Sequence, residues 1–316
     1  MTTTIRSNKM VAILWTLTAL LIVSGCFESS NEARNDPRPI FAVSVEPHAF
    51  LLDRIGGDRI RVEVLVPSGQ DPHHYEATPE KIAALSKARV LFRTGMPFED
   101  VFLPKLQSVS KNLEIVDLRV GLVLRTLELH SHDNGDASTG HEHHVGCSHD
   151  GLDPHIWFAP TMLKRQAETV LRTLLEKDVD RENQAFFRKN FEAFVEEIEA
   201  TRKELAEKLA PFKGRTVFVF HPSYGYFCDE FGLKQTAVEF EGKSPGPQRI
   251  TELIAATKNE GGAPVIFVQP EFNRAPAEAI AEATGGKIVV HSGLDRDVLA
   301  NLRRFTDEFV RAETGK

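Results

Sequence analysis

The amino-acid sequence predicts an α/β protein made of two Rossmann-like lobes, each with a parallel sheet, joined by a long helix. Short apolar, β-branched runs alternate with helical periods between residues 40 and 118. The same alternation returns between residues 216 and 313. Between the two regions, residues 181–209 keep one uninterrupted helical period. Strands that alternate with helices are typical of parallel sheets covered by helices.

The composition fits this fold class. The chain has 316 residues, of which 41% are hydrophobic and 26% are charged, as in ordinary soluble proteins. This length is sufficient for two hydrophobic cores. The formal net charge is -7, and an acidic balance argues against a general nucleic-acid-binding protein.

The N-terminus has the pattern of a secretory signal. Two basic residues precede an apolar run at residues 10–23, which is shorter than a typical membrane-spanning helix. The sequence Val-Ser-Gly-Cys, ending at Cys26, resembles a bacterial lipobox. It implies removal of residues 1–25 and lipidation of Cys26, whereas an ordinary secretory signal is the alternative. Residues 26–38 are polar and are predicted to be a tether.

The first lobe is assigned to residues 39–160. Its four strands are expected at residues 40–45, 59–66, 89–93 and 113–118. Helices are expected at residues 48–55, from residue 78, and at residues 98–109. Thr78 is the expected N-cap of the second of these helices, with Pro79 at its first position.

A helical region at residues 161–211 and a second lobe at residues 212–316 follow. Helices are expected at residues 162–177 and 181–209, where apolar residues at helical spacing indicate packing against a core. The strands of the second lobe are expected at residues 216–220, 236–240, 265–268 and 287–290. Its helices are expected at residues 224–231, 248–259, 275–284 and 295–313.

Three histidines occupy positions where a metal site is expected. The sequence Asp-Pro-His occurs twice, ending at His73 and at His155, and His221 directly follows a predicted strand. Ligands bind beyond the carboxyl ends of strands in open α/β sheets. Imidazole suits zinc and similar metals. Although a lone histidine is more often structural, three at such points predict a metal site in the cleft between the lobes.

Zinc usually has four ligands, so a further donor is expected from the second lobe. The candidates from the sequence are His291, Ser292, Asp295, Asp297, Glu271 and water. Metal-bound histidines commonly donate their second ring nitrogen to a carboxylate or a carbonyl group. Acidic residues that could accept such a bond are Asp71, Asp153 and Glu239.

Several longer motifs together carry a resemblance to a known family. They are GQDPHHYEATP at residues 69–79, DPHIW at 153–157, FHPSYGYF at 220–227, EFEGKSP at 239–245 and FVQPEF at 267–272. With these motifs the chain resembles the zinc and manganese substrate-binding proteins of bacterial ATP-driven importers. That family has two lobes and a rigid helical backbone, and the resemblance covers nearly the whole mature chain.

The resemblance implies metal ligation by His73, His155 and His221. Histidine at the third position is typical of zinc-type members, whereas manganese-type members commonly have glutamate there, so Zn²⁺ is expected and Mn²⁺ is the alternative. The family usually has an aspartate where this chain has Ser292. The resemblance therefore leaves the fourth ligand open among His291, Asp295, Glu271 and water.

A histidine-rich segment lies between the two Asp-Pro-His copies and is expected to be a loop. Its histidines are His130, His132, His141, His143, His144 and His149. Because mobile ligands lose entropy when they bind, we expect an accessory, lower-affinity zinc-collecting site. A solvated loop with incidental metal affinity is the alternative. Cys147 is predicted to bind metal there, to pair with Cys228 or to remain a thiol.

The resemblance implies an extracytoplasmic binding protein without catalytic activity. It would be a monomer, held by a lipid anchor at the periplasmic or extracellular face, that delivers zinc to a permease with an ATPase partner. A surface adhesin of the same family is one alternative. A secreted zinc hydrolase is another, but residues 141–144 lack the His-Glu-x-x-His spacing. Binding requires neutral imidazoles, so affinity should fall below about pH 6.5.

Overall fold

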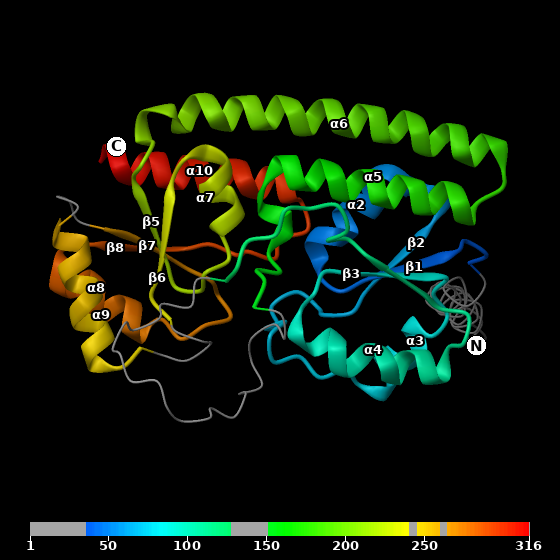
Figure 1. Ribbon diagram of the computed structural model, residues 1–316, viewed down its shortest axis with the longest axis horizontal. Helices are drawn as coiled ribbons and strands as arrows, with labels where there is room; N and C mark the ends of the chain where they lie inside the picture. Colours follow the sequence, from blue (N-terminus) through cyan, green and yellow to red (C-terminus); the bar gives the residue numbers. More distant parts are fainter. Residues whose placement is uncertain (1–35, 128–150, 240–244, 260–263, 316) are drawn as a thin grey trace, which may run out of the picture. The chain divides into compact units, whose positions relative to one another are not determined.

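The computed structural model describes residues 36–127, 151–239, 245–259 and 264–315 (Figure 1). The chain from residue 39 onward forms one compact unit. It contains two four-stranded sheets, and every strand pairing within them is parallel. The predicted α/β class with two lobes and a long connecting helix is confirmed. Among the described residues, no helix has the length and hydropathy needed to cross a membrane.

The first sheet has the strand order β2-β1-β3-β4. Its strands are β1 (Ile40–Val43), β2 (Arg61–Val64), β3 (Val90–Arg93) and β4 (Glu114–Asp117). The helices of this lobe are α2 (Glu46–Gly56), α3 (Pro79–Leu85) and α4 (Pro97–Val109), with a short 3-10 turn η3 (Gly57–Arg59). Thr78 caps α3 by accepting a bond from the Lys81 amide, as predicted.

The second sheet repeats this arrangement with the order β6-β5-β7-β8. Its strands are β5 (Thr216–Val219), β6 (Lys234–Ala237), β7 (Val265–Val268) and β8 (Lys287–Val290). Its helices are α7 (Gly225–Phe231), α8 (Pro247–Asn259), α9 (Ala275–Thr284) and α10 (Val298–Thr314).

Several element ends differ from the sequence-based expectation by one to three residues, and two of these differences have a clear cause. Strand β6 lies two residues earlier than predicted, because Lys234 pairs with Thr216 at the start of β5. Helix α10 begins later than predicted, because the Asp297 side chain accepts a bond from the Ala300 amide and caps the helix there. In both cases a specific partner, rather than apolar periodicity, sets the end of the element.

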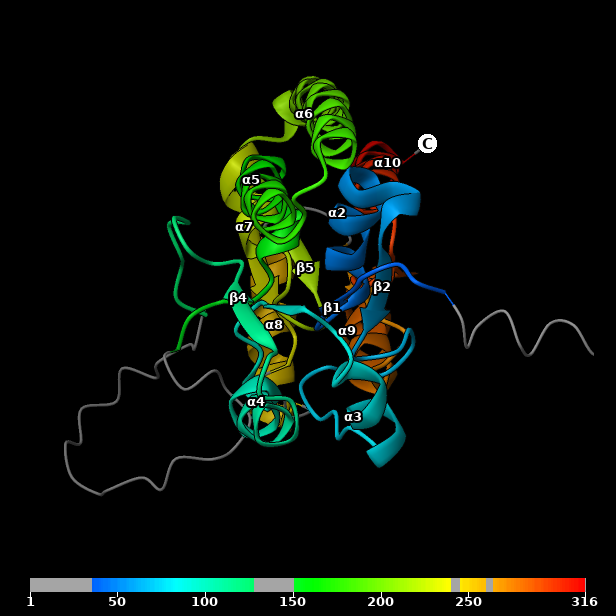
Figure 2. The same ribbon diagram turned by 90° about the vertical axis from the view of Figure 1, so that its right-hand side faces the viewer.

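Two helices connect the lobes: α5 (Pro160–Lys177) and α6 (Arg181–Leu209). Helix α6 runs alongside both lobes (Figure 1), and in the perpendicular view it lies on the side of α5 and α10, opposite α3 and α4 (Figure 2). Phe187, Phe194 and Ile198 of α6 are buried in the main hydrophobic core. That core includes residues of both sheets, so the helices and the two lobes share one continuous apolar interior.

A buried histidine lies in the first turn of α2. The side chain of His48 is fully buried. Its ring and the indole of Trp157 form an edge-to-face contact, with ring centroids 5.5 Å apart. Burial lowers the pKa of His48 to about 3, and Gln166 only partly offsets this effect. The folded state therefore holds this imidazole neutral, whereas the unfolded chain protonates it near pH 6.5.

The His48 contribution predicts acid sensitivity. Above pH 6.5 this imidazole is neutral in both states and does not affect the free energy of unfolding. As pH falls from 6.5 towards about 3, only the unfolded state takes up the proton, so the folded state is progressively destabilised. At pH 5 the loss is about 2 kcal/mol. Urea unfolding at two pH values should show a smaller loss in a His48→Phe variant than in wild type. Equal losses in both proteins would contradict the assignment.

Candidate metal centre

The structure brings three of the predicted residues together. His73 lies on the loop after β2, His155 precedes a short 3-10 turn η4 (Ile156–Phe158), and His221 follows β5. One ring nitrogen from each lies within 4.8 Å of the others. The ring centroids are 4.6 Å apart for His73 and His221, and 4.9 Å apart for His155 and His221. Among the described residues, these three form the one such group of histidine, cysteine or acidic side chains.

Hydrogen bonds fix which ring nitrogen of two histidines faces the others. His155 Nδ1 donates to the Asp153 carboxylate at 2.7 Å, and His221 Nδ1 donates to Glu239 at 2.5 Å. Each Nε2 then carries a lone pair, and the two Nε2 atoms lie 3.1 Å apart. His73 Nε2 is also buried and has no hydrogen-bond partner among the described residues. The nitrogens of the three rings thus converge as a metal site of histidine ligands requires.

Burial keeps the imidazoles of His73 and His155 in the neutral form that binds metal. It lowers the pKa of His73 well below the usual value, and His221 and His155 lower it further. Burial also lowers the pKa of His155, although the Asp153 carboxylate acts in the opposite direction. Both rings are therefore neutral at pH 7, and a metal need not displace a proton from them.

The two Asp-Pro-His copies make the same local turn. In each, the aspartate accepts a hydrogen bond from the backbone amide of its histidine, at 2.8 Å for Asp71 and His73 and at 2.9 Å for Asp153 and His155. Proline between them has a fixed φ and needs no donor. The copies differ in their side-chain bonds, because Asp71 bonds to the exposed ring of His74 and not to the ring of His73.

Gln269 positions His221 through hydrogen bonds to its backbone. It follows β7, the strand beside β5, so its amide reaches the loop that carries His221. Its Oε1 accepts from the His221 amide at 3.2 Å, and its Nε2 donates to the His221 carbonyl at 3.1 Å and to Ser223 Oγ at 3.0 Å. The sequence motif contained Gln269, but only the pairing of β5 with β7 reveals this contact.

The cavity at the three histidines is very small. Its volume is about 30 Å³, and aromatic side chains make much of its wall. Phe272 stacks on the His221 ring at 5.1 Å, and Trp157 meets the His155 ring at 5.4 Å. Sites for organic ligands commonly enclose about 300 Å³ or more. This cavity holds a single ion or a water molecule.

The candidates for the fourth ligand lie in different environments. Glu271 lines the cavity, and burial raises the pKa of its carboxyl group, with Asp71 and Asp295 raising it further. His291 does not line the cavity, and its Nδ1 donates to Glu308 at 2.9 Å. Asp295 is paired with Arg304.

The remaining polar candidates of this stretch also point elsewhere. The Ser292 hydroxyl accepts a bond from the Leu294 amide, and Asp297 caps α10. None of the acids in the described part of the second lobe joins the three histidines within 4.8 Å. Glu271 is therefore the single sequence candidate that shares their cavity.

Several predicted residues lie outside the described part of the chain. They are Cys26, Cys147 and the loop histidines His130, His132, His141, His143, His144 and His149. Cys228 is buried within α7. Its pairing with Cys147 therefore stays untested.

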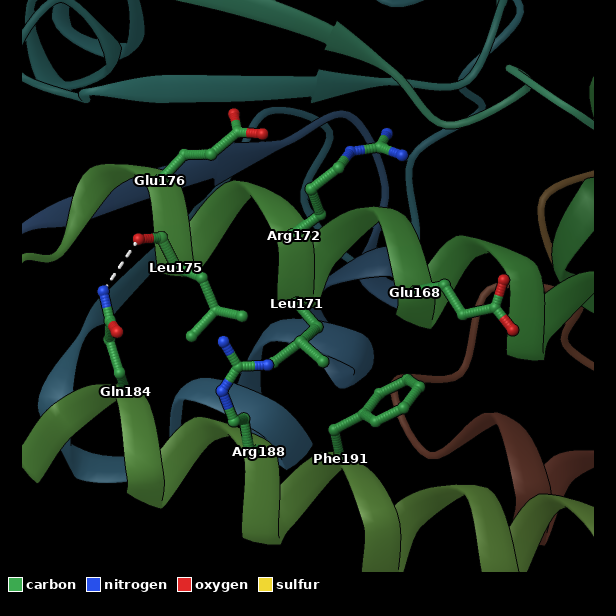
Figure 3. A pocket seen from close by; sticks show the side chains of 8 residues that line it. All are labelled: Glu168, Leu171, Arg172, Leu175, Glu176, Gln184, Arg188 and Phe191. Carbon is green, nitrogen blue, oxygen red and sulfur yellow. Dashed lines mark hydrogen bonds between the residues drawn. The ribbon is translucent and has the colours of Figure 1, made fainter. Parts of the chain in front are cut away.

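A larger cavity of about 460 Å³ lies between α5 and α6 (Figure 3). Leu171, Leu175 and Phe191 provide its apolar lining, and Arg188 extends from α6 towards the two leucines. The eight residues that line it include no histidine and no cysteine. It offers none of the nitrogen or sulfur donors that zinc prefers, so the histidine cluster is the candidate metal centre.

Comparisons with known proteins agree with this geometry. The family model of the zinc-uptake complex component A periplasmic (ZnuA) matches residues 42–308. The high-affinity zinc uptake system protein ZnuA of Yersinia pestis is 28% identical over 290 residues, covering 84% of this chain and 89% of that protein. A crystal structure of ZnuA is 33% identical, with a TM-score of 0.76, and covers 87% of this chain and 99% of that one.

A second curated relative is longer. The zinc-binding lipoprotein AdcA of Streptococcus pneumoniae is 25% identical over 309 residues, which are 96% of this chain. These residues correspond to 57% of AdcA, so the chain spans little more than half of that relative.

The carboxylate behind His221 should contribute to metal affinity. In Glu239→Gln the bond to His221 Nδ1 loses its charge, which makes Nε2 a weaker donor. We expect Zn²⁺ affinity to fall about 10- to 100-fold in competition with a chelating dye. Glu252→Gln, which removes a partly exposed carboxylate on α8, is the control. Equal losses in both variants would show a general charge effect instead.

Proposed function

Because this chain belongs to the family of periplasmic component A proteins of zinc-uptake complexes, we propose that it captures Zn²⁺ outside the cytoplasm for import. Like the other members of this family, it is a solute-binding component and not an enzyme. The ion is its cargo. Its partner in this proposal is the permease of an ATP-driven importer with its ATPase.

The convergence of three imidazole nitrogens supports zinc as the cargo. Zn²⁺ is commonly bound by histidine nitrogen, whereas manganese sites have more carboxylate and water oxygen donors. The rings of His155 and His221 are already oriented by Asp153 and Glu239, so little ordering is needed when the ion arrives. Mn²⁺ is the alternative cargo, and the same titration described below distinguishes the two ions.

We propose that the fourth donor is Glu271 or a water molecule. Glu271 is the acid that lines the histidine cavity from the second lobe, and a bound cation would favour its ionised form. His291 does not line that cavity, and using Asp295 as a ligand would break its contact with Arg304. Water as the fourth ligand would leave the Glu271 carboxylate to accept a hydrogen bond from it.

The N-terminal assignments belong to the same proposal. Residues 1–25 would be removed as a signal, and Cys26 would carry a lipid that anchors the protein at the periplasmic or extracellular face. Residues 26–38 would be the tether to the first lobe at residues 39–160. Residues 161–211 and 212–316 would be the connecting helices and the second lobe, and the protein would act as a monomer.

Removing single imidazoles tests the site. We expect His73→Ala and His221→Ala each to weaken Zn²⁺ binding at least 100-fold, because each loses one of three nitrogen donors. Metal content per chain and competitive titration with Zn²⁺ and Mn²⁺ provide the measurement. His74→Ala is the matched control, since its ring is exposed beside His73 and bonds to Asp71.

Two results would contradict the proposal. One is His74→Ala being as damaging as His73→Ala. The other is tight Zn²⁺ binding that persists in His221→Ala. Stronger binding of Mn²⁺ than of Zn²⁺ by the wild type would favour the manganese alternative.

The histidine-rich segment should add capacity and leave the cleft unchanged. Replacing residues 130–149 with a short Gly-Ser linker removes all six loop histidines and keeps the Thr126–Leu152 bridge at the base. We expect the high-affinity site to keep its Kd within about threefold, while additional weaker Zn²⁺ binding disappears. Calorimetric titration separates the two classes. Loss of all Zn²⁺ binding in this variant would place the main site in the loop.

A further inference from the structure

The segment that carries His155 is attached to the second lobe at both of its ends. Tyr226 Oη, from α7, donates to the Asp153 carbonyl at 2.8 Å. The indole Nε1 of Trp157 donates to the Gly293 carbonyl, beyond β8, at 2.9 Å. Although His155 precedes the connecting helices in sequence, its backbone is thus tied to the lobe that provides His221.

The Tyr226 hydroxyl is the centre of a small buried network. It also accepts a bond from the Arg125 amide at 3.2 Å, and the Arg125 carbonyl accepts from the Asp153 amide at 2.9 Å. Burial raises the pKa of Tyr226, so the phenol keeps its proton and remains a donor. One hydroxyl group therefore satisfies the backbone of two chain segments at the base of the bridge between Thr126 and Leu152.

The network ends at a proposed metal ligand. Asp153 Oδ1 accepts from both the His155 amide and His155 Nδ1, so the position of the Asp153 backbone determines the orientation of the ring. On the basis of the proposed zinc site, we propose that Tyr226 is a positioning residue for metal binding. It fixes Asp153, and through Asp153 the His155 ring, against the second lobe.

This arrangement divides the three histidines into a pair and a single residue. His155 and His221, with Nε2 atoms 3.1 Å apart, are both held by the second lobe. Within the described chain, residues 67–78 make no hydrogen bond to that lobe, and the His73 amide bonds instead to Asp71. The pair is therefore held by the second lobe, and His73 is the ligand that the first lobe adds to it.

Removing one oxygen atom tests the proposal. Tyr226→Phe should weaken Zn²⁺ binding about tenfold in dye competition and change the visible absorption spectrum of bound Co²⁺, because the His155 ring loses its fixed orientation. Tyr224→Phe is the matched control, since its hydroxyl is buried but has no hydrogen-bond partner among the described residues. It should leave both the Kd and the Co²⁺ spectrum unchanged.

A double-mutant cycle separates positioning from general stability. If Tyr226 acts through His155, Tyr226→Phe should cause no further loss of Zn²⁺ affinity in a His155→Ala background. A tenfold loss that persists in that background would overturn the proposal. So would a lower Tm of Tyr226→Phe with an unchanged Kd and Co²⁺ spectrum.

Trp157→Phe gives an independent test of the same anchoring. It removes the other link of the segment and should likewise weaken Zn²⁺ binding only when His155 is present. Unchanged affinity in both Tyr226→Phe and Trp157→Phe would overturn the proposal. Tight Zn²⁺ binding by His73→Ala and His221→Ala would instead overturn the proposed zinc site itself, so the two failures are distinguishable.

Discussion

The proposed metal centre depends on two carboxylates that orient imidazole rings. Asp153 and Glu239 each accept the Nδ1 proton of a histidine, which turns the opposite nitrogen towards the cavity. Without these two bonds, His155 and His221 could relieve the crowding of their Nε2 atoms by rotating or by changing tautomer. The buried carboxylates restrict both ring rotation and tautomer change. The two Nε2 lone pairs therefore stay directed at the cavity, where a cation can bind them.

The fold provides the rigidity that this arrangement needs. Both sheets are parallel, and the loops that follow β2 and β5 carry His73 and His221. Helix α6 buries its apolar side in the core shared by both lobes, which limits how far the lobes can separate. A site assembled from both lobes then needs only small movements to open. Its affinity comes from groups that are largely ordered before the metal arrives.

Much of this could be predicted from the sequence, because the determining signals are local. Alternating strands and helices gave the fold class, and the strand ends drew attention to His73 and His221. The second-lobe donor could not be predicted in this way. His291 seemed suitable from its place after the last strand, yet its side chain does not line the cavity of the three histidines. The role of Tyr226 is equally invisible in sequence, since it depends on a contact with Asp153 across 73 positions.

The small cavity has a consequence for which ions the protein accepts. A volume of about 30 Å³ has no room for an ion with its hydration shell, so the ion must lose most of its water before the site closes. Mg²⁺ gives up water reluctantly and prefers oxygen donors, whereas histidine nitrogen replaces the water of zinc effectively. We therefore expect hard cations such as Mg²⁺ to bind poorly, because losing their water costs more free energy than this site returns. The aromatic side chains of Phe272 and Trp157 support the histidine rings and also leave little room for water beside the ion.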